Sequence, residues 1–142
     1  MGRLSGMGSN VHDNLAELKA RSGKDPIAVF LGMKLEELSS GYARVSMQLK
    51  PDYLNFNGLV FGGIIVALAD QAFAYASNTL AYPSYACQFN IHFIAGPAED
   101  DELMAECSVV KNGRKVGLSE MTVTNQDGKL IAKADGNTIP AE

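Results

Sequence analysis

Residues 55–74 read NFNGLVFGGIIVALADQAFA, and this stretch decides the fold. Two asparagines and Gly58 are typical of a loop, which ends at the pair Gly62-Gly63. From residue 64 to residue 80 the chain is apolar on every side of a helix. A helix that is apolar all round is normally buried in a core. The stretch therefore predicts a loop followed by one long buried helix.

The segments before this loop predict a short helix and two strands. Residues 42–49 alternate between apolar and polar side chains, as a half-buried strand does, and we expect them to pair with residues 33–38. Apolar residues recur at helical spacing over residues 11–18, and Gly23 and Asp25-Pro26 then stop the pattern. The sequence thus predicts an N-terminal helix and a strand pair ahead of the long helix.

Four further strands are expected after the long helix, arranged as a meander. The first alternates over residues 85–93, which predicts Tyr85 and Cys87 on its apolar, core-facing side. Asn112-Gly113 and Asp127-Gly128 then separate the last three strands. Both pairs are strong hairpin signals because the two central residues of a type I′ turn need positive φ.

The length and the order of these segments predict a single α+β domain. The chain has 142 residues, 46% of them hydrophobic, which is enough for one compact core. We assign residues 1–30 to an N-terminal tail and short helix, and residues 31–142 to the domain itself. One curved antiparallel sheet wrapped round the central helix would bury the apolar faces of both. Such an open sheet has exposed edges, which favours a homo-oligomer.

Charge and cysteine content exclude several functional classes. Twelve Lys and Arg face 16 Asp and Glu, so a net charge of −4 argues against nucleic acid as a partner. The two cysteines lack metal-ligand spacing, so we predict no metal and no cofactor. No targeting or membrane-spanning segment is recognisable, so we expect a cytoplasmic protein without a membrane partner.

Asp70 is the residue that stands out chemically. It is the only formally charged side chain between residues 53 and 98, and it lies in the most hydrophobic helix. A partly desolvated carboxyl group has a raised pKa and can act as a general base or nucleophile. The alternative is a structural aspartate that is hydrogen bonded to a neighbour such as Gln71.

Gly62 and Gly63 form the second unusual feature, because they lie at the positive end of the same helix. Their uncovered backbone N–H groups could serve as an oxyanion hole. The alternative is a tight entry into the helix that only glycine permits. Asp70 lies about 12 Å along the helix from Gly62, at about 1.5 Å per residue. If both serve one reaction, Asp70 must meet Gly62 of a twofold-related copy, with the two helices antiparallel.

The stretch quoted above resembles the signature of the hotdog-fold acyl-CoA thioesterases, specifically their phenylacetate-pathway (PaaI-type) group, and the likeness extends from about residue 33 to 139. The resemblance implies hydrolysis of an acyl-CoA thioester to free acid and CoA, by a dimer or dimer of dimers. It assigns Asp70 as general base or nucleophile, the Gly62 amide as oxyanion hole, and Asn55 to orient water or substrate. Aromatic residues near the helix start, such as Phe61 and Phe73, would suit an aromatic or medium-chain acyl group.

The remaining expected site residues are contacts for the substrate. Many relatives carry His where this chain has Phe61, and Ala86, with Ser84 nearby, falls where some relatives have a hydroxyl. Three cations around the Asn112-Gly113 hairpin could hold the CoA phosphates, or could simply form a solvated turn. The predicted substrate-binding set is Gly63, Phe61, Asn57, Lys111, Arg114 and Lys115.

Two rival functions are left open by the sequence. A non-catalytic acyl-CoA-binding or regulatory module would keep the pocket and the glycines but would not need Asp70. Hydration or dehydration of an acyl-CoA would use a His together with Asp or Glu, but no His occurs in the central helix or in the loop before it.

Overall fold

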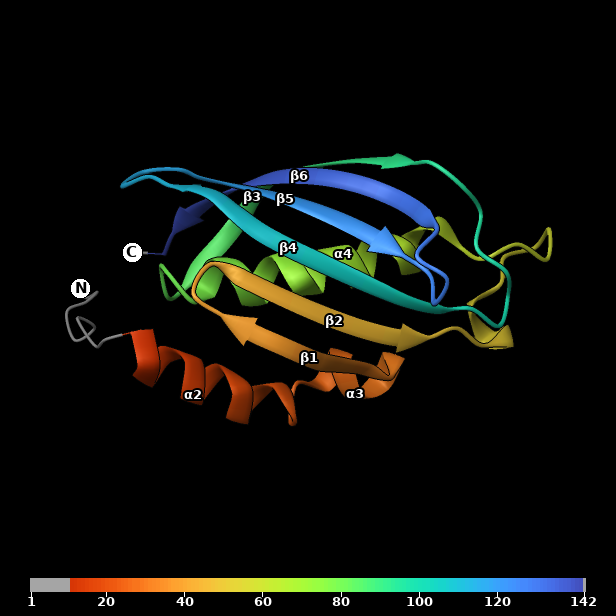
Figure 1. Ribbon diagram of the computed structural model, residues 1–142, viewed down its shortest axis with the longest axis horizontal. Helices are drawn as coiled ribbons and strands as arrows, with labels where there is room; N and C mark the ends of the chain where they lie inside the picture. Colours follow the sequence, from red (N-terminus) through yellow and green to blue (C-terminus); the bar gives the residue numbers. More distant parts are fainter. Residues whose placement is uncertain (1–10, 142) are drawn as a thin grey trace.

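The protein is a long helix held in the hollow of a curved antiparallel sheet (Figure 1). The computed structural model describes residues 11–141. The elements are α2 (Val11–Ser22), α3 (Pro26–Leu31), β1 (Met33–Ser39), β2 (Tyr42–Gln48), the 3-10 turn η1 (Pro51–Tyr53), α4 (Gly62–Asn78), β3 (Ser84–Phe93), β4 (Glu102–Asn112), β5 (Gly117–Thr124) and β6 (Leu130–Pro140). The predicted α+β hotdog architecture is confirmed.

The six strands lie in the order β1-β2-β4-β5-β6-β3, and every neighbouring pair is antiparallel. Strands β4 to β6 form the expected meander, but β3 lies beside β6 at the far edge, so the four-strand meander was wrong. The connection over residues 94–101 has no tight-turn signal and crosses from one side of the sheet to the other. Strands β1 and β3 are consequently the two edges.

Strand β3 contains a bulge that reverses the predicted facing of its first residues. The register shifts between Ala86 and Gln88, which leaves Cys87 as the extra residue. Phe89 and Phe93 pair with β6 residues on the α4-facing side, whereas Tyr85 is 60% exposed and Cys87 is also exposed. The prediction of Tyr85 and Cys87 on the core-facing side was therefore wrong, because a bulge breaks simple alternation.

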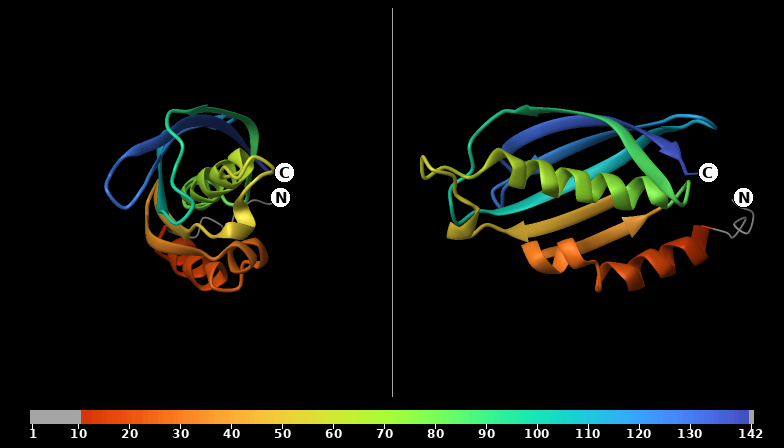
Figure 2. Two further views of the ribbon diagram at one scale, coloured as in Figure 1. Left: turned by 90° about the vertical axis from the view of Figure 1, so that its right-hand side faces the viewer. Right: turned by 180° about the vertical axis from the view of Figure 1, so that it is seen from behind.

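The central helix is less buried than its sequence predicts. Its core-facing side includes Leu68 and Phe73, which are almost fully buried. Gly63, Asp70 and Ala74 are exposed and mark a stripe along the opposite side. Figure 2 (right) shows that the sheet covers α4 from one side only. The expectation of burial all round is thus corrected, and no other segment within residues 11–141 covers the apolar residues of the stripe.

The N-terminal segment forms two helices rather than the single one predicted. Helix α2 packs beside β1, and α3 follows after a short turn (Figure 1). Asp25 accepts the backbone N–H of Ala28 as N-cap, Pro26 occupies the first helical turn, and Gly32 ends α3 with φ 75°. These are ordinary start and stop signals. Asp25-Pro26 therefore ends one helix and begins the next.

Both predicted hairpins are present, but only one uses its glycine as expected. Gly128 has φ 80°, and its N–H bonds to the Asn125 carbonyl oxygen at 3.0 Å. Gly113 does not have positive φ, and Asn112 pairs with Gly117 across a longer link. The link therefore has four residues, 113–116, instead of the two of a type I′ turn. No helix within residues 11–141 is long and apolar enough to cross a membrane.

Candidate active site

The N-terminus of α4 presents free backbone donors. Gly62 and Gly63 are its first two residues, and the N-cap Phe61 makes no side-chain hydrogen bond. Ile64 donates to the Phe61 carbonyl oxygen at 3.0 Å, but the N–H groups of Gly62 and Gly63 bond to nothing else in the described chain. The helix macrodipole adds partial positive charge at this end. Both amides are therefore available to a negatively charged oxygen.

Aromatic rings crowd the two glycines. A Cβ on Gly63 would overlap the Phe61 ring, which folds back over the helix start. A Cβ on Gly62 would lie 3.4 Å from the Phe93 ring, which is an ordinary contact. A side chain at position 63 would therefore displace the exposed Phe61 ring, whereas one at position 62 would displace nothing. Phe61 is 55% exposed, so the same ring also forms part of the surface in front of the amides.

Asp70 lies on the exposed stripe of α4. Partial burial among neighbouring protein atoms raises the pKa of its carboxyl group above the usual aspartate range, although the side chain remains exposed in the isolated chain. No charged neighbour or hydrogen bond among the described residues contributes to this shift. Asp70 is therefore a partly desolvated carboxylate without an internal partner.

The alternative in which Gln71 binds Asp70 is not what the structure shows. Gln71 Nε2 instead donates to Asp25 Oδ2 at 2.7 Å and to the Tyr75 hydroxyl at 2.8 Å. The Tyr75 hydroxyl in turn donates to Asp25 Oδ2 at 3.0 Å. This network fastens the turn before α3 to the central helix, and it leaves the Asp70 carboxylate free.

Asn55 organises the loop that leads into α4. Its Oδ1 accepts the backbone N–H groups of Asn57 at 2.9 Å and Leu59 at 3.2 Å. Its backbone N–H donates to the Leu59 carbonyl oxygen at 2.7 Å, and Gly58 supplies positive φ. The side-chain oxygen is therefore already used, and only the Nδ2 group is left for a substrate or water. The Asn57 side chain is exposed on the same loop.

The hairpin cations lie at the other end of the fold from Gly62. Lys111, Arg114 and Lys115 are exposed, and Arg114 borders a small pocket of about 240 Å³ with Ser84, close to where α4 ends. Ser84 donates its N–H to Asn78 Oδ1 at 3.0 Å, and its own hydroxyl is buried without a partner among residues 11–141. Neither the cations nor Ser84 are brought to Asp70 within one chain.

Cys107 does not provide a reactive thiol. Cys107 is fully buried, as predicted, and desolvation raises the pKa of its thiol to about 12. Such a thiol stays protonated at neutral pH. In the part of the chain that the structure describes, no cluster of three or more His, Cys, Asp or Glu side chains could hold a metal ion.

Gly62 and Asp70 remain separated by two turns of one continuous helix. An aspartate side chain cannot span the roughly 12 Å between them. Both groups nevertheless open onto the uncovered side of the molecule, next to the free edge of β3. Exposed rings at this edge include Tyr85 at 60% and Phe93 at 54%. Each chain therefore presents two halves of a site without joining them.

Comparison with known proteins identifies the family. The model of the thioesterase superfamily matches residues 57–132, more than half of the chain. The acyl-coenzyme A thioesterase PaaI of Escherichia coli is 31% identical over 80% of this chain and 81% of its own length. The solved structure of E. coli PaaI, from the phenylacetic acid degradation operon, superposes with a TM-score of 0.87 at 28% identity, covering 94% of this chain and 97% of that one.

A Streptococcus mutans protein solved with bound acetyl CoA is 25% identical, with a TM-score of 0.74, and the match covers 77% of this chain and 88% of that one. Residues 57–132, which match the thioesterase superfamily model, contain the end of the loop after Asn55, the glycine pair and Asp70. The chain belongs to the thioesterase superfamily, in its PaaI-type group, and is a thioester hydrolase.

Proposed function

We propose that the protein hydrolyses acyl-CoA thioesters at two equivalent sites, each formed where Asp70 of one copy meets the α4 N-terminus of another. The observation that carries this proposal is the position of Asp70, which is partly desolvated and unpartnered, on the same open side as the uncapped amides of Gly62 and Gly63. The E. coli relative is named an acyl-coenzyme A thioesterase, which supports the substrate class.

The chemistry follows from these two groups. The Asp70 carboxylate takes a proton from a water molecule that attacks the thioester carbonyl carbon, or attacks that carbon itself and is released by water afterwards. The carbonyl oxygen becomes an oxyanion and accepts a hydrogen bond from the partner's Gly62 amide. The carbon–sulfur bond then breaks, and the departing thiolate takes up a proton to give CoA.

A twofold axis is the simplest way to bring the halves together. With α4 antiparallel to its copy, Val66 lies midway between Gly62 and Asp70 and would sit at the axis. The stripe on α4 and the free edge of β3, with the exposed Tyr85 and Phe93, would then be covered by the second copy. The dimer is a proposal that supplies a cover for both surfaces.

The substrate contacts are proposed in the same frame. Phe61 and Gly63 border the oxyanion position, and Asn55 Nδ2 can donate to substrate or water, with Asn57 on the same loop. The long pantetheine arm places the CoA phosphates far from the thioester, which allows Lys111, Arg114 and Lys115 to contact them at the β4–β5 hairpin. The solved relative with bound acetyl CoA supports a CoA ester as ligand.

The direct test is replacement of Asp70 by Asn, which keeps the size of the side chain. Release of CoA is followed with phenylacetyl-, benzoyl- and straight-chain acyl-CoA esters, and the oligomeric state is checked by light scattering. We expect a loss of about 10²- to 10⁴-fold in kcat with the oligomer intact. Undiminished turnover would remove the mechanism, and tight acyl-CoA binding without hydrolysis by the native protein would favour a binding module.

A further inference from the structure

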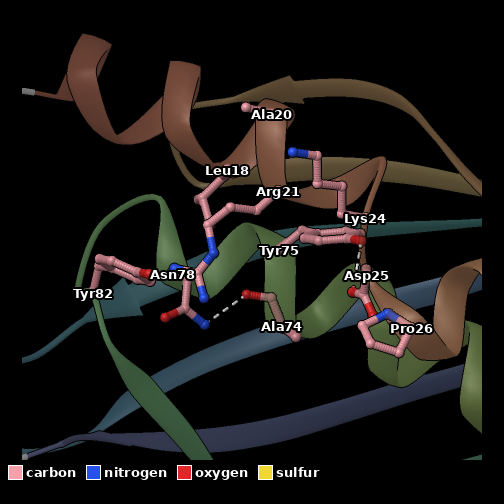
Figure 3. Close-up of a pocket in the computed structure, with 10 residues that line it drawn as sticks. All are labelled: Leu18, Ala20, Arg21, Lys24, Asp25, Pro26, Ala74, Tyr75, Asn78 and Tyr82. Atoms are coloured by element: carbon pink, nitrogen blue, oxygen red, sulfur yellow. Dashed lines mark hydrogen bonds between the residues drawn. The ribbon is translucent and has the colours of Figure 1, made fainter.

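A pocket of about 640 Å³ lies between α2 and the C-terminal half of α4, where no catalytic group has been placed. Figure 3 shows its lining, with the side chains of α2 on one side and those of α4 on the other. Its lining includes Leu18, Arg21, Lys24, Ala74, Tyr75 and Tyr82. The wall from α2 lies outside residues 57–132, the segment that the family model matches.

The pocket begins one helical turn beyond Asp70. Ala74 and Asn78, which line it, follow Asp70 by four and eight residues on the same open side of α4. At about 1.5 Å per residue, they lie about 6 and 12 Å along the helix from the carboxylate. A medium-chain acyl group whose thioester carbon lies at Asp70 is long enough to extend along α4 into this pocket. An extended pantetheine arm is longer than this separation, so the CoA phosphates would reach the pocket only if the arm folded back.

Most polar groups in the pocket are already hydrogen bonded. Asp25 accepts from Gln71 and Tyr75, as described above. Asn78 donates from Nδ2 to the Ala74 carbonyl oxygen at 2.8 Å and accepts the Ser84 N–H. These groups close the pocket without offering a bond to a ligand.

Two cationic side chains of the lining, Arg21 and Lys24, take no part in these hydrogen bonds. Arg21 lies over the Tyr82 ring, 5.6 Å from its centroid, and its only ion pair within the described residues is a loose contact with the exposed Glu17 at 3.7 Å. Lys24 has no acidic partner within 4.0 Å among those residues. Figure 3 shows Arg21 reaching toward Tyr82 and Asn78, and Asn78 lies eight residues beyond Asp70 on α4. The Asn78 end of this mainly apolar pocket is thus lined by the Arg21 guanidinium, and Lys24 lies beside Tyr75 and Asp25.

We propose that this pocket receives the acyl group and that Arg21 and Lys24 select acyl chains whose far end carries a carboxylate. The inference rests on the proposed thioesterase function, since it takes the thioester to be at Asp70. The apolar walls from Leu18, Tyr75 and Tyr82 hold the methylene or aryl part of the acyl group. The terminal carboxylate then finds the cationic donors that the protein leaves unused.

The test compares two CoA esters of equal chain length, suberyl-CoA with a terminal carboxylate and octanoyl-CoA with a methyl group. The wild type is expected to prefer suberyl-CoA in kcat/KM. In the double variant Arg21→Gln, Lys24→Gln the suberyl-to-octanoyl ratio should fall at least about tenfold, the effect of losing one charge-assisted hydrogen bond. Lys19→Gln removes one positive charge from an exposed position of α2 outside the pocket and should leave the ratio unchanged.

A second measurement compares the dissociation constants of suberyl-CoA and octanoyl-CoA, determined by calorimetry on the Asp70→Asn variant. Hydrolysis of both esters with no preference for suberyl-CoA, or a ratio that the double variant does not change, would overturn the pocket assignment. The latter result is also expected if a loop of a second copy fills the pocket. If the native protein hydrolyses no ester but binds suberyl-CoA more tightly through Arg21 and Lys24, the pocket assignment stands and the thioesterase proposal fails.

Discussion

Replacing Gly62 with proline removes one backbone N–H and little else. Gly62 is the first residue of α4, the position where proline is most readily accepted in a helix. Phe61 before it has φ −63° and ψ 127°, the extended conformation that proline requires of its predecessor. The Gly62 N–H makes no hydrogen bond within the described chain, so the proline substitution removes no hydrogen bond from the folded protein. The added Cβ meets only the exposed Phe93 ring, at 3.4 Å.

The expected effect is therefore confined to catalysis. Loss of one oxyanion-hole donor lowers kcat by about 10²- to 10³-fold, which corresponds to about 3 to 4 kcal/mol of transition-state stabilisation. Gly62→Ala makes the same Cβ contact but keeps the N–H, so it should lose no more than about threefold. The assay is CoA release under saturating ester, with thermal unfolding as a check on the fold. Equal activity of the proline and alanine variants would refute the oxyanion role of this amide.

Three further outcomes follow from the structure. Because the pKa of Asp70 is raised, the rate of hydrolysis should increase with pH and reach its plateau above the usual aspartate range. The stability that the protonated carboxyl group contributes should be lost as pH rises through its folded-state pKa. Denaturation of wild type and Asp70→Asn at pH 4 and pH 7 checks this: wild type should lose stability relative to the variant at pH 7. Gly136→Ala places a Cβ 2.7 Å from the Phe73 ring, so urea denaturation should show a loss of about 1 to 3 kcal/mol, and a change below about 0.5 would contradict this packing. Asp25→Ala should cost about 1 to 3 kcal/mol by leaving the buried Tyr75 hydroxyl without its acceptor, whereas unchanged stability would show that the network is dispensable.

The sequence was most informative where one local signal dominated. The unbroken apolar run after Gly62 predicted the central helix, and the alternation over residues 42–49 predicted β2 and its pairing with β1. Asp70 was conspicuous because no other charge lies near it in the sequence. The helix rise of about 1.5 Å per residue was sufficient to show that Gly62 and Asp70 of one chain cannot meet.

The sequence was least informative where the outcome depended on contacts between distant segments. The bulge at Cys87 and the position of β3 beside β6 arise from pairing across the sheet, which no local pattern encodes. The cationic pocket was also missed, because α2 and the end of α4 are joined only in the folded chain. By contrast, α3 had a readable signal in Asp25, Pro26 and Gly32, the cap residues of a short helix.

The central claim is that each site takes Asp70 from one chain and Gly62 from another, and mixing two inactive variants tests it directly. Asp70→Asn and Gly62→Pro are refolded together in equal amounts. A mixed dimer carries one intact site, formed by Asp70 of the proline variant and Gly62 of the asparagine variant. With random pairing of twofold dimers, the mixture should recover about one quarter of the wild-type activity. If mixed dimers form and activity stays at the level of the parent variants, the site does not cross between chains.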